Sequence, residues 1–296
     1  MNIQSAIIEG INKLKRSRIQ TAQLDTEILM AKALGKDRKY IVLNNNKDLL
    51  NENLEYFKKL IKERSSRKPI AQLINKKFFW NSEFFVTSDT LIPRPDTELA
   101  IEHILKLSKH KNTMSILDIG CAQGGFAGMI AEHLNDFTYT GVDISEEMIS
   151  KAKEKYPQHN FHIVKENDYS KVTGKYDVSL VLGILHLHES WRNTIQIAWN
   201  HTKSSLILDL REIFEETVED KNKSYFTMDI NGSNEDYSEV LPYNLINSGE
   251  ALEIVNSICT GAEKISYYGY SQDPAKTAVT PNHKIFANVY LVQKER

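Results

Sequence analysis

The stretch from Ser115 to Ser145 constrains the fold most, because it reads as a strand, a glycine-rich turn, a helix, a second strand and an acid. The apolar run 115–119 precedes the turn 120–125, and a second apolar run, 138–142, ends at Asp143. Glycines let a backbone turn tightly and approach a ligand closely, and amides at a helix start favour polar or anionic groups. Ligands of open parallel sheets bind beside the carboxyl ends of the strands. The stretch therefore predicts a nucleotide pocket, although many such turns are merely tight.

Apolar runs continue to alternate with amphipathic segments after this stretch, which is typical of a parallel sheet with helices on both faces. Strands are expected at 115–119, 138–142, 161–164, 178–182 and 205–210, and helices at 125–134, 146–155, 190–200 and 248–258. The runs 264–269 and 285–292 predict an antiparallel pair that closes the sheet. The polar run 221–239 predicts a lid or a disordered loop, because loops that long are uncommon in a compact domain. The fold class is α/β, with a mostly parallel, Rossmann-like sheet of seven strands.

The first 74 residues predict helices only, in a small all-α bundle. Apolar residues recur at helical spacing in three stripes: Ile3, Ile7, Ile11 and Leu14; Leu24, Ile28, Ala31 and Leu34; and Leu54, Phe57 and Ile61. Asp37 and Asn51 are expected to cap helices, and Pro69 suits the first turn of another. Residues 75–96 predict a β-hairpin, with strands at 77–80 and 83–87, followed by a proline-containing linker. The expected domains are 1–74, 75–96 for the hairpin and linker, and 97–296.

Charge is distributed unevenly between these parts. The chain has a formal net charge of -2, but residues 1–75 contain 15 basic and 8 acidic side chains, against 22 and 31 in the remainder. The overall charge argues against a general nucleic-acid binder, whereas the basic bundle predicts contact with something anionic or simply a solvated face. No apolar run is long enough to span a bilayer and no signal peptide is apparent, so a cytoplasmic location is expected. Two cysteines are too few for a disulfide framework or a zinc cluster.

The position of Asp143, 23 residues beyond Gly120, strengthens the nucleotide interpretation. A carboxylate at the end of the second strand can accept both ribose hydroxyl protons. A dinucleotide-binding turn has the spacing G-x-G-x-x-G, which Gly120, Ala122 and Gly124 do not match well. The motifs Leu-Asp-Ile-Gly-Cys-Ala-Gln-Gly and Gly-Val-Asp-Ile-Ser instead resemble those of class I S-adenosylmethionine-dependent methyltransferases, with Ala122 in place of a usual glycine. This resemblance implies S-adenosylmethionine as cofactor and a binding site comprising Asp118, Gly120, Cys121, Ala122, Gly124, Asp143, Ile144, Asn167, Asp168 and Gly183.

Methyl transfer from a sulfonium requires mainly that the nucleophile be held in line, sometimes with removal of a proton. Candidate groups should lie after the fourth strand, in residues 183–191. His186 is the first candidate for a base or orienting group, because imidazole titrates near neutrality. It could equally pack against the cofactor or cap the next helix. His186, His188 and Glu189 could be considered as metal ligands, but they do not have a recognisable metal-binding spacing. No metal is therefore expected.

The first hundred residues resemble the peptide-chain release factor glutamine N5-methyltransferases, the PrmC/HemK family. The resemblance rests on Asp25-Thr26-Glu27-Ile28-Leu29, on 67–74 with the aromatic hairpin, and on Leu91-Ile92-Pro93-Arg94-Pro95-Asp96-Thr97-Glu98. It implies that the helical domain helps to grip a release factor and that the arginine-proline segment borders the cofactor and substrate. The expected substrate-side residues are Arg94, Thr97, Glu98, His188 and Tyr243. Helix capping and a proline linker explain the last of these motifs equally well.

The resemblance breaks after the fourth strand. Members of that family have Asn-Pro-Pro-Tyr there, which binds the amide to be methylated, whereas this chain has Leu182-Gly183-Ile184-Leu185. Leu241-Pro242-Tyr243-Asn244 follows the fifth strand and is not expected to take that place. The leading hypothesis is therefore a divergent S-adenosylmethionine-dependent methyltransferase acting on a small molecule or a protein side chain. The alternatives are glutamine methylation of a release factor, a catalytically silent adaptor protein and, more remotely, a nicotinamide oxidoreductase.

Overall fold

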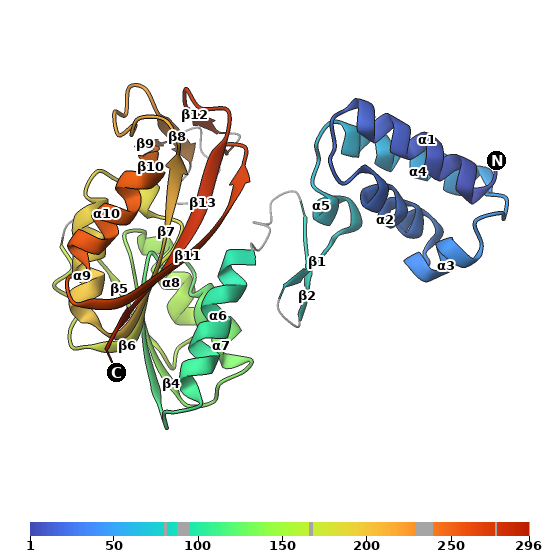
Figure 1. Cartoon of the computed structure of the whole chain (residues 1–296). Coiled ribbons are helices and arrows are strands. Elements are labelled where there is room, and N and C mark those ends of the chain that lie inside the picture. Colours follow the sequence, from blue (N-terminus) through green and yellow to red (C-terminus); the bar gives the residue numbers. More distant parts are fainter. Residues whose placement is uncertain (80–81, 88–94, 166–167, 229–238, 276, 296) are drawn as a thin grey trace. The chain divides into compact units, whose positions relative to one another are not determined.

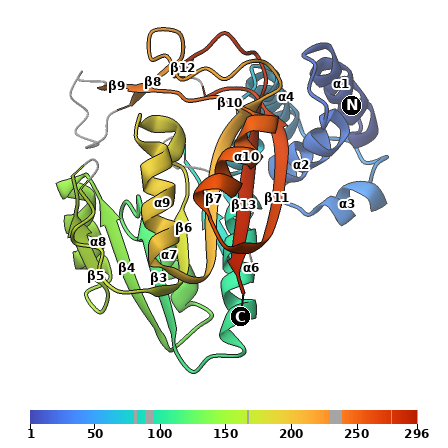
Figure 2. The same cartoon turned by 60° about the vertical axis from the view of Figure 1, so that its left-hand side comes forward.

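The computed structural model describes residues 1–79, 82–87, 95–165, 168–228, 239–275 and 277–295. The chain divides into two compact units, Met1–Glu98 and Leu99–Arg296. Most elements of both are labelled in Figure 1, and β3 (Met114–Ile119) is labelled in Figure 2. No helix among the residues described is both long and apolar enough to cross a membrane.

The N-terminal unit consists mainly of helices, as the apolar stripes predict. Its helices are α1 (Ile3–Arg16), α2 (Ala22–Leu34), α3 (Arg38–Leu43), α4 (Asn51–Ser65) and α5 (Ile70–Ile74). Asp37 caps α3 as expected, because its side chain accepts a hydrogen bond from the Tyr40 amide. The cap expected at Asn51 is wrong by one residue: Leu50 has the extended backbone of a cap, and Asn51 is already helical.

A partly buried ion pair joins the helices of this unit. The Asp25 carboxylate on α2 accepts a hydrogen bond of 2.7 Å from Nε of Arg64 on α4. Arg64 also donates to the Lys68 carbonyl at 3.0 Å, which ties the segment before α5 to the same pair. Around it lies an apolar core that includes Leu14, Leu29 and Phe57. The unit continues into the antiparallel strands β1 (Lys76–Phe79) and β2 (Ser82–Phe85), where a hairpin is expected from the sequence.

The C-terminal unit is built on one large sheet. Seven strands lie in the order β11-β13-β7-β6-β3-β4-β5, and their bounds are β3 (Met114–Ile119), β4 (Phe137–Asp143), β5 (Asn160–Ile163), β6 (Tyr176–Val181), β7 (Thr202–Ile213), β11 (Ala262–Gln272) and β13 (Ile285–Lys294). Strands β5, β4, β3, β6 and β7 are parallel, whereas β13 runs antiparallel to both β7 and β11. The predicted fold class, a mostly parallel sheet with an antiparallel closing pair, is confirmed.

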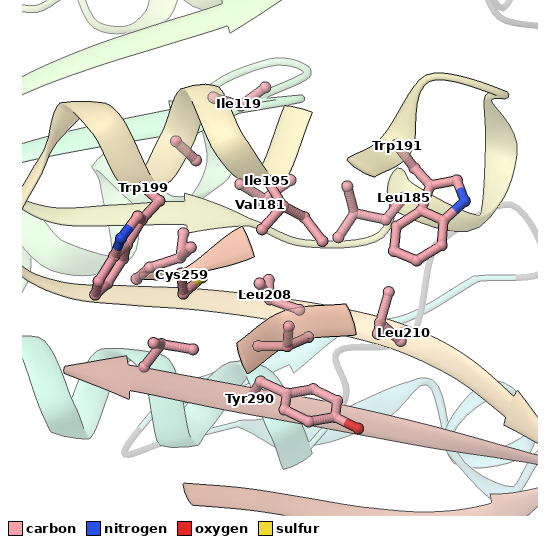
Figure 3. Close-up of a cluster of buried hydrophobic side chains, with 14 of the residues drawn as sticks. Ile119, Val181, Leu185, Trp191, Ile195, Trp199, Leu208, Leu210, Cys259 and Tyr290 are labelled. Atoms are coloured by element: carbon pink, nitrogen blue, oxygen red, sulfur yellow. The ribbon is translucent and has the colours of Figure 1, made fainter. Parts of the chain in front are cut away.

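Helices cover both faces of this sheet: α6 (Pro95–Ser108), α7 (Gly125–Ala131), α8 (Glu146–Lys155), α9 (Trp191–His201) and α10 (Ser248–Ile258). Figure 3 shows Trp191, Ile195 and Trp199 of α9 packed with Leu208 and Leu210 of β7. Each large apolar side chain buried in this way contributes roughly 1.5–3 kcal/mol. On the opposite face, Nε2 of His103 in α6 lies 2.9 Å from Oγ of Ser205 in β7. This packing fixes β6 and β7, whose ends carry the candidate site.

A small second sheet departs from the sequence-based expectation. Strands β8 (Tyr225–Met228), β9 (Glu239–Pro242) and β12 (Ala278–Val279) form a three-stranded antiparallel sheet, and β10 (Ile246–Asn247) pairs with β7. The run 221–239 is not a loop throughout, because residues 225–228 form β8 and residue 239 begins β9. Residues 229–238 lie outside the described part of the chain, and the role of a lid stays a prediction. These strands pair with each other and with β12 far along the chain, which no local pattern reveals. Figure 2 shows the small sheet beyond the carboxyl ends of the parallel strands.

Candidate functional site

The glycine turn after β3 adopts left-handed backbone conformations at three positions. Gly120 has φ +85°, Ala122 has φ +45° and Gly124 has φ +75°. The amides of Gly120 and Cys121 both donate to the carbonyl of Val142 in β4, at 2.8 and 3.1 Å. The turn is thereby folded back over the end of the neighbouring strand. Its helix α7 starts at Gly125, so the turn and the helix start face the carboxyl edge of the sheet.

A side chain is unfavourable at two positions of this turn, for different reasons. A Cβ on Gly120 would lie 2.6 Å from Cγ2 of Ile184, so the turn after β6 packs directly on that glycine. Ala122 carries a Cβ in the left-handed region, where non-glycine residues cost roughly 1–2 kcal/mol. This conformation explains why a glycine is usual at the position in the motif that the sequence resembles.

Asp143 ends β4, beside the glycine turn. One carboxylate oxygen accepts the Ala122 amide at 2.9 Å, and the other accepts the Ser145 amide at 2.9 Å. Ile144, the next residue, is 56% exposed, which is unusual for an isoleucine beside a sheet edge. The structure thus places a fixed carboxylate and an exposed apolar side chain together at the rim of the glycine turn.

Asp118 and Cys121 lie below the turn rather than on its surface. The Asp118 side chain accepts a hydrogen bond from the Tyr139 hydroxyl and is only 3% exposed as a residue. Burial raises the pKa of Asp118 to about 7; the Tyr139 hydrogen bond opposes that shift and the charge of Asp143 adds to it. Burial also raises the pKa of the Cys121 thiol far above its ordinary range. These two residues are buried beneath the glycine turn.

Asp168 lies in the loop after β5 and is exposed. Its carboxylate accepts a hydrogen bond from the Ser170 amide at 3.1 Å, and the hydrogen bonds of Ser170 lower its pKa. The neighbouring Asn167, predicted to be a second residue on this side, lies outside the described residues. Asp168 remains a prediction as a cofactor ligand.

The turn after β6, residues 183–188, brings together several predicted residues. Gly183 has φ +81°, and a short 3₁₀ turn follows at Leu185–Leu187. His186 is buried, and its ring meets that of Tyr243 edge-on at 5.4 Å between centroids. His188 is half-buried at the end of the same turn. The structure therefore assembles His186, His188 and Tyr243, predicted from distant positions, on one side of the sheet edge.

The segment that contains Tyr243 does not replace the turn after β6 but packs against it. Asn244 donates its backbone amide to the His186 carbonyl at 2.8 Å and its side-chain amide to the His188 carbonyl at 2.9 Å. Its side-chain nitrogen is therefore engaged with main-chain carbonyls. This arrangement agrees with the sequence-based expectation. Leu241–Asn244 packs against the turn after β6 and does not take the place of an Asn-Pro-Pro-Tyr motif there.

Sequence reasoning missed a buried ionic pair in β7. Asp209 accepts the Gly183 amide at 2.6 Å and also pairs with Nη1 of Arg211 at 2.6 Å. Both side chains of the pair are almost completely buried. The sequence does show charged residues, Asp209 and Arg211, within and directly after the apolar run of the fifth strand. It does not indicate which turn they contact.

The residues predicted from the arginine-proline segment are not tested by the structure. Arg94 and the side chain of Thr97 lie outside what is described, and Glu98 is a half-buried residue of α6. These three remain predictions. In the described part of the chain, no three His, Cys, Asp or Glu side chains gather in a manner that could hold a metal ion.

Two family models match separate parts of the chain. Residues 5–74 match the PrmC N-terminal domain, and residues 117–206 match a methyltransferase domain. The first match coincides with the helical bundle. The second runs from the end of β3, through the glycine turn and Asp143, to β7.

Curated relatives are named release factor glutamine methyltransferase. The protein from Clostridium botulinum (strain Hall) is 32% identical over 160 residues, which cover 54% of this chain and 56% of the relative. The protein from Escherichia coli (strain K12) is 30% identical over 185 residues, covering 61% of this chain and 65% of the relative. The chain thus spans less than two thirds of the length of these relatives.

Solved structures overlap with the chain less closely. The N-terminal domain of EvdMO1 with SAH bound covers 75% of this chain and 91% of its own, at 12% identity and a TM-score of 0.49. A likeness of that degree carries no inference about ligand or substrate. Residues 5–74 are thus similar to the PrmC N-terminal domain and residues 117–206 to a methyltransferase domain, and the chain is similar over 54–61% of its length to these release factor glutamine methyltransferases.

Proposed function

We propose that this protein is an S-adenosylmethionine-dependent methyltransferase. The observation that carries the proposal is the glycine turn 120–124, with the Asp143 carboxylate 2.9 Å from the Ala122 amide at its rim. A backbone turn without bulky side chains leaves room for a ligand, and a fixed carboxylate beside it suits the two hydroxyls of a ribose. The donor set of this chain therefore fits the cofactor.

Each pocket residue has a distinct part in this proposal. Gly120, Ala122 and Gly124 form the wall against the amino-acid portion of the cofactor, and Asp143 accepts from the ribose. Ile144 offers its exposed side chain to the adenine, and Asp168 accepts from the adenine amine. Gly183 closes the pocket from the turn after β6. Asp118 and Cys121 support the turn from below, which is consistent with their burial.

The bound cofactor supplies an activated methyl group, so the protein must align the acceptor with it and exclude competing water. Reacting atoms held about 3 to 3.5 Å apart gain much of the available rate enhancement from orientation alone. The turn after β6 and the small sheet lie at the same edge as the glycine turn, so they are the elements placed to do this.

His186 is a candidate orienting group rather than a freely accessible base. Its ring is packed edge-on against Tyr243, and its carbonyl accepts the Asn244 amide. A buried imidazole of this kind can hold an acceptor or the neighbouring turn in place. The sequence leaves open whether His186 acts as a base or packs in place. The burial of its ring favours packing and orientation.

The acceptor is proposed to be a small molecule or a protein side chain other than a glutamine amide. An amide nitrogen is a poor nucleophile, and the Asn-Pro-Pro-Tyr turn that binds it in the related family is absent from residues 182–185. The specific observation in favour of a release factor as acceptor is the PrmC N-terminal domain at residues 5–74. That domain, with its excess of basic residues, is the proposed contact for a protein partner.

Calorimetry with S-adenosylhomocysteine tests cofactor binding. Asp143→Ala should weaken binding roughly 100-fold, because hydrogen bonds to a charged group are each worth about 1.5–3 kcal/mol. Asp143→Asn retains the shape and should lose less. Asp220→Ala, which removes an exposed carboxylate from the 214–247 segment, should bind as the wild type does. Absence of binding to the wild-type protein would contradict the proposal and would favour the adaptor hypothesis.

Transfer of labelled methyl groups separates the two acceptor classes. Incubation with a release factor containing Gly-Gly-Gln should leave that protein unlabelled if the acceptor is not a glutamine amide. Labelling at the glutamine would instead establish the alternative, glutamine methylation by a site without Asn-Pro-Pro-Tyr.

A further inference from the structure

The turn 183–188 is held from two sides by residues that are distant in sequence. From β7, Asp209 accepts the Gly183 amide at 2.6 Å. From the segment after β9, Asn244 donates to the carbonyls of His186 at 2.8 Å and His188 at 2.9 Å. The turn is therefore tethered at its beginning, middle and end by two residues outside it.

The tether at Gly183 is rigid because Asp209 is itself immobilised. Its second carboxylate oxygen lies 2.6 Å from Nη1 of Arg211, and both side chains are buried. A buried ion pair often adds little net stability, because desolvating two charges offsets their attraction. A carboxylate held in this way nevertheless presents its other oxygen in one direction, and that oxygen meets Gly183 in its left-handed conformation.

The tether at Asn244 satisfies groups that the turn cannot satisfy alone. A single 3₁₀ turn, Leu185–Leu187, leaves main-chain carbonyls without partners inside it. The backbone and side-chain amides of the buried Asn244 reach the carbonyls of residues 186 and 188. Buried carbonyls seldom remain unpaired, so these bonds favour one conformation of the turn.

This turn also touches the proposed cofactor pocket. The side chain of Ile184 packs so closely on Gly120 that a Cβ there would lie 2.6 Å from it. Residues 182–188 contain no proline to restrict the backbone, so its rigidity must come from contacts made by other elements. A displacement of the turn would be transmitted through Ile184 to the glycine turn.

We infer that Asp209 and Asn244 are positioning residues, which hold the turn 183–188 as a preorganised wall between the cofactor and the acceptor. The inference rests on the proposed function. Neither residue needs to touch a ligand; each acts through the turn. Two side-chain hydrogen bonds, together with the backbone amide of Asn244, supply the stiffness that a proline-containing turn has in its own backbone.

Hydrogen exchange combined with cofactor binding tests the inference on the full chain. In Asp209→Asn and Asn244→Ala, exchange of the amides of residues 183–188 should become about tenfold faster, as expected when one hydrogen bond is weakened. The dissociation constant of S-adenosylhomocysteine should rise about tenfold in both variants, measured where they are fully folded. Asp209→Asn keeps the size of the side chain and one oxygen, which can accept from only one of the Gly183 amide and Arg211, so it weakens the contact with less loss of packing than Asp209→Ala.

Asn247→Ala is the matched control. Asn247 also makes side-chain hydrogen bonds, to the amides of Gly249 and Glu250 and to the carbonyls of Phe214 and Glu215, but it contacts the start of α10 and not the turn. It should lower the melting temperature while leaving cofactor affinity and exchange at 183–188 within twofold of the wild type.

Each remaining outcome contradicts the inference in a definite way. Faster exchange with unchanged affinity would make the tethers merely structural. Weaker affinity without faster exchange would show that they do not act through the turn. If the wild-type protein binds the cofactor and both variants match it, the inference alone is refuted. If the wild-type protein does not bind, the proposed function fails and the role in the pocket fails with it.

Discussion

Ala122 has a backbone conformation that is unfavourable for alanine. It lies between two glycines in the turn, with φ +45°, where a Cβ meets the following carbonyl. The sequence shows that an alanine stands in a glycine-rich turn, but not which of its residues take the left-handed conformation. Only the folded turn shows that Ala122 carries the strain.

Ala122→Gly should therefore stabilise the C-terminal unit. Relief of the left-handed strain, about 1–2 kcal/mol, is offset in part by the greater freedom of glycine in the unfolded chain, leaving a net gain below about 1 kcal/mol. Chemical denaturation of the two proteins measures the difference. Gly124→Ala is the converse change at φ +75° and should destabilise; equal stability of all three proteins would contradict the strain.

Asp118 is a buried carboxyl group whose protonation should change in the neutral range. Its folded pKa of about 7 is above the ordinary value of 3.8, because burial disfavours the carboxylate. The folded state then binds more protons than the unfolded state between about pH 4 and 7, so this group makes stability fall as pH rises through that window.

Asp118→Asn should remove the pH dependence of stability that Asp118 contributes. The asparagine oxygen still offers the Tyr139 hydroxyl an acceptor. The difference in unfolding free energy between variant and wild type should grow with pH up to about pH 7, by at most on the order of 4 kcal/mol, and level off above it. Denaturant titrations at pH 5, 6, 7 and 8 measure it. A constant difference across these pH values would show that Asp118 has an ordinary pKa.

At the scale of elements, local patterns were sufficient for the large sheet. The helices α8 and α10 have the residues expected from their apolar periodicity, and the strands of the large sheet overlap the predicted runs. Pairing between distant segments was not predictable in the same way. Strands β8, β9 and β12 are short, and their partners lie up to about fifty residues away, so no alternation within one run reveals them.

The residues of the candidate site also differ in how far the sequence could predict them. Gly120, Asp143 and Gly183 could be proposed from the sequence because they belong to a local motif or follow a predicted strand. Asp209, Arg211 and Asn244 were missed because their importance depends on what they contact: the sequence shows polar residues in apolar surroundings but not their partners.

The segment leading to β8 is anchored to α9 by Glu219. Its carboxylate accepts from the indole of Trp191 at 2.6 Å and from two nitrogens of Arg192 at 2.6 and 2.8 Å. Although burial opposes the shift, the hydrogen bonds of Arg192 and Trp191 keep the pKa of Glu219 below its ordinary value. This bidentate contact connects the small sheet with the start of α9.

Glu219→Ala should loosen that connection. Amide exchange in residues 218–228 should become roughly tenfold faster, as expected for the loss of about 1–2 kcal/mol of charge-assisted hydrogen bonding in a partly exposed site. Glu55→Ala, which removes the exposed pair with Lys58 on α4, is the control and should leave exchange there unchanged. Unchanged exchange in both variants would show that the Glu219 contact does not hold the segment.

At the scale of the whole molecule, the two compact units have separate apolar cores. The core of the first includes Leu29 and Phe57, and that of the second includes Trp191 and Leu208. A ligand that binds only folded protein stabilises the unit it binds. The proposed pocket residues 118–144, 168 and 183 all belong to the second unit.

S-adenosylhomocysteine should therefore raise one melting transition and leave the other in place. At a ligand concentration 100 times the dissociation constant, the stabilisation is about 2.7 kcal/mol, enough to shift a melting temperature by a few degrees. Calorimetric scans with and without ligand measure it, with adenosine-free buffer as the reference. A single transition that shifts as a whole would show instead that the units unfold together.

The small sheet also limits how parts of this protein can be exchanged. Its strands come from two insertions in the large sheet, because β8 and β9 follow β7 whereas β12 lies between β11 and β13. Ala278 pairs with Phe226, and the Thr227 amide donates to the Thr277 carbonyl at 3.2 Å. A chimera that receives residues 214–247 alone would carry an unpaired strand edge, which invites aggregation. The two insertions must therefore be exchanged together in any recombinant protein, because each supplies a strand that pairs with the other.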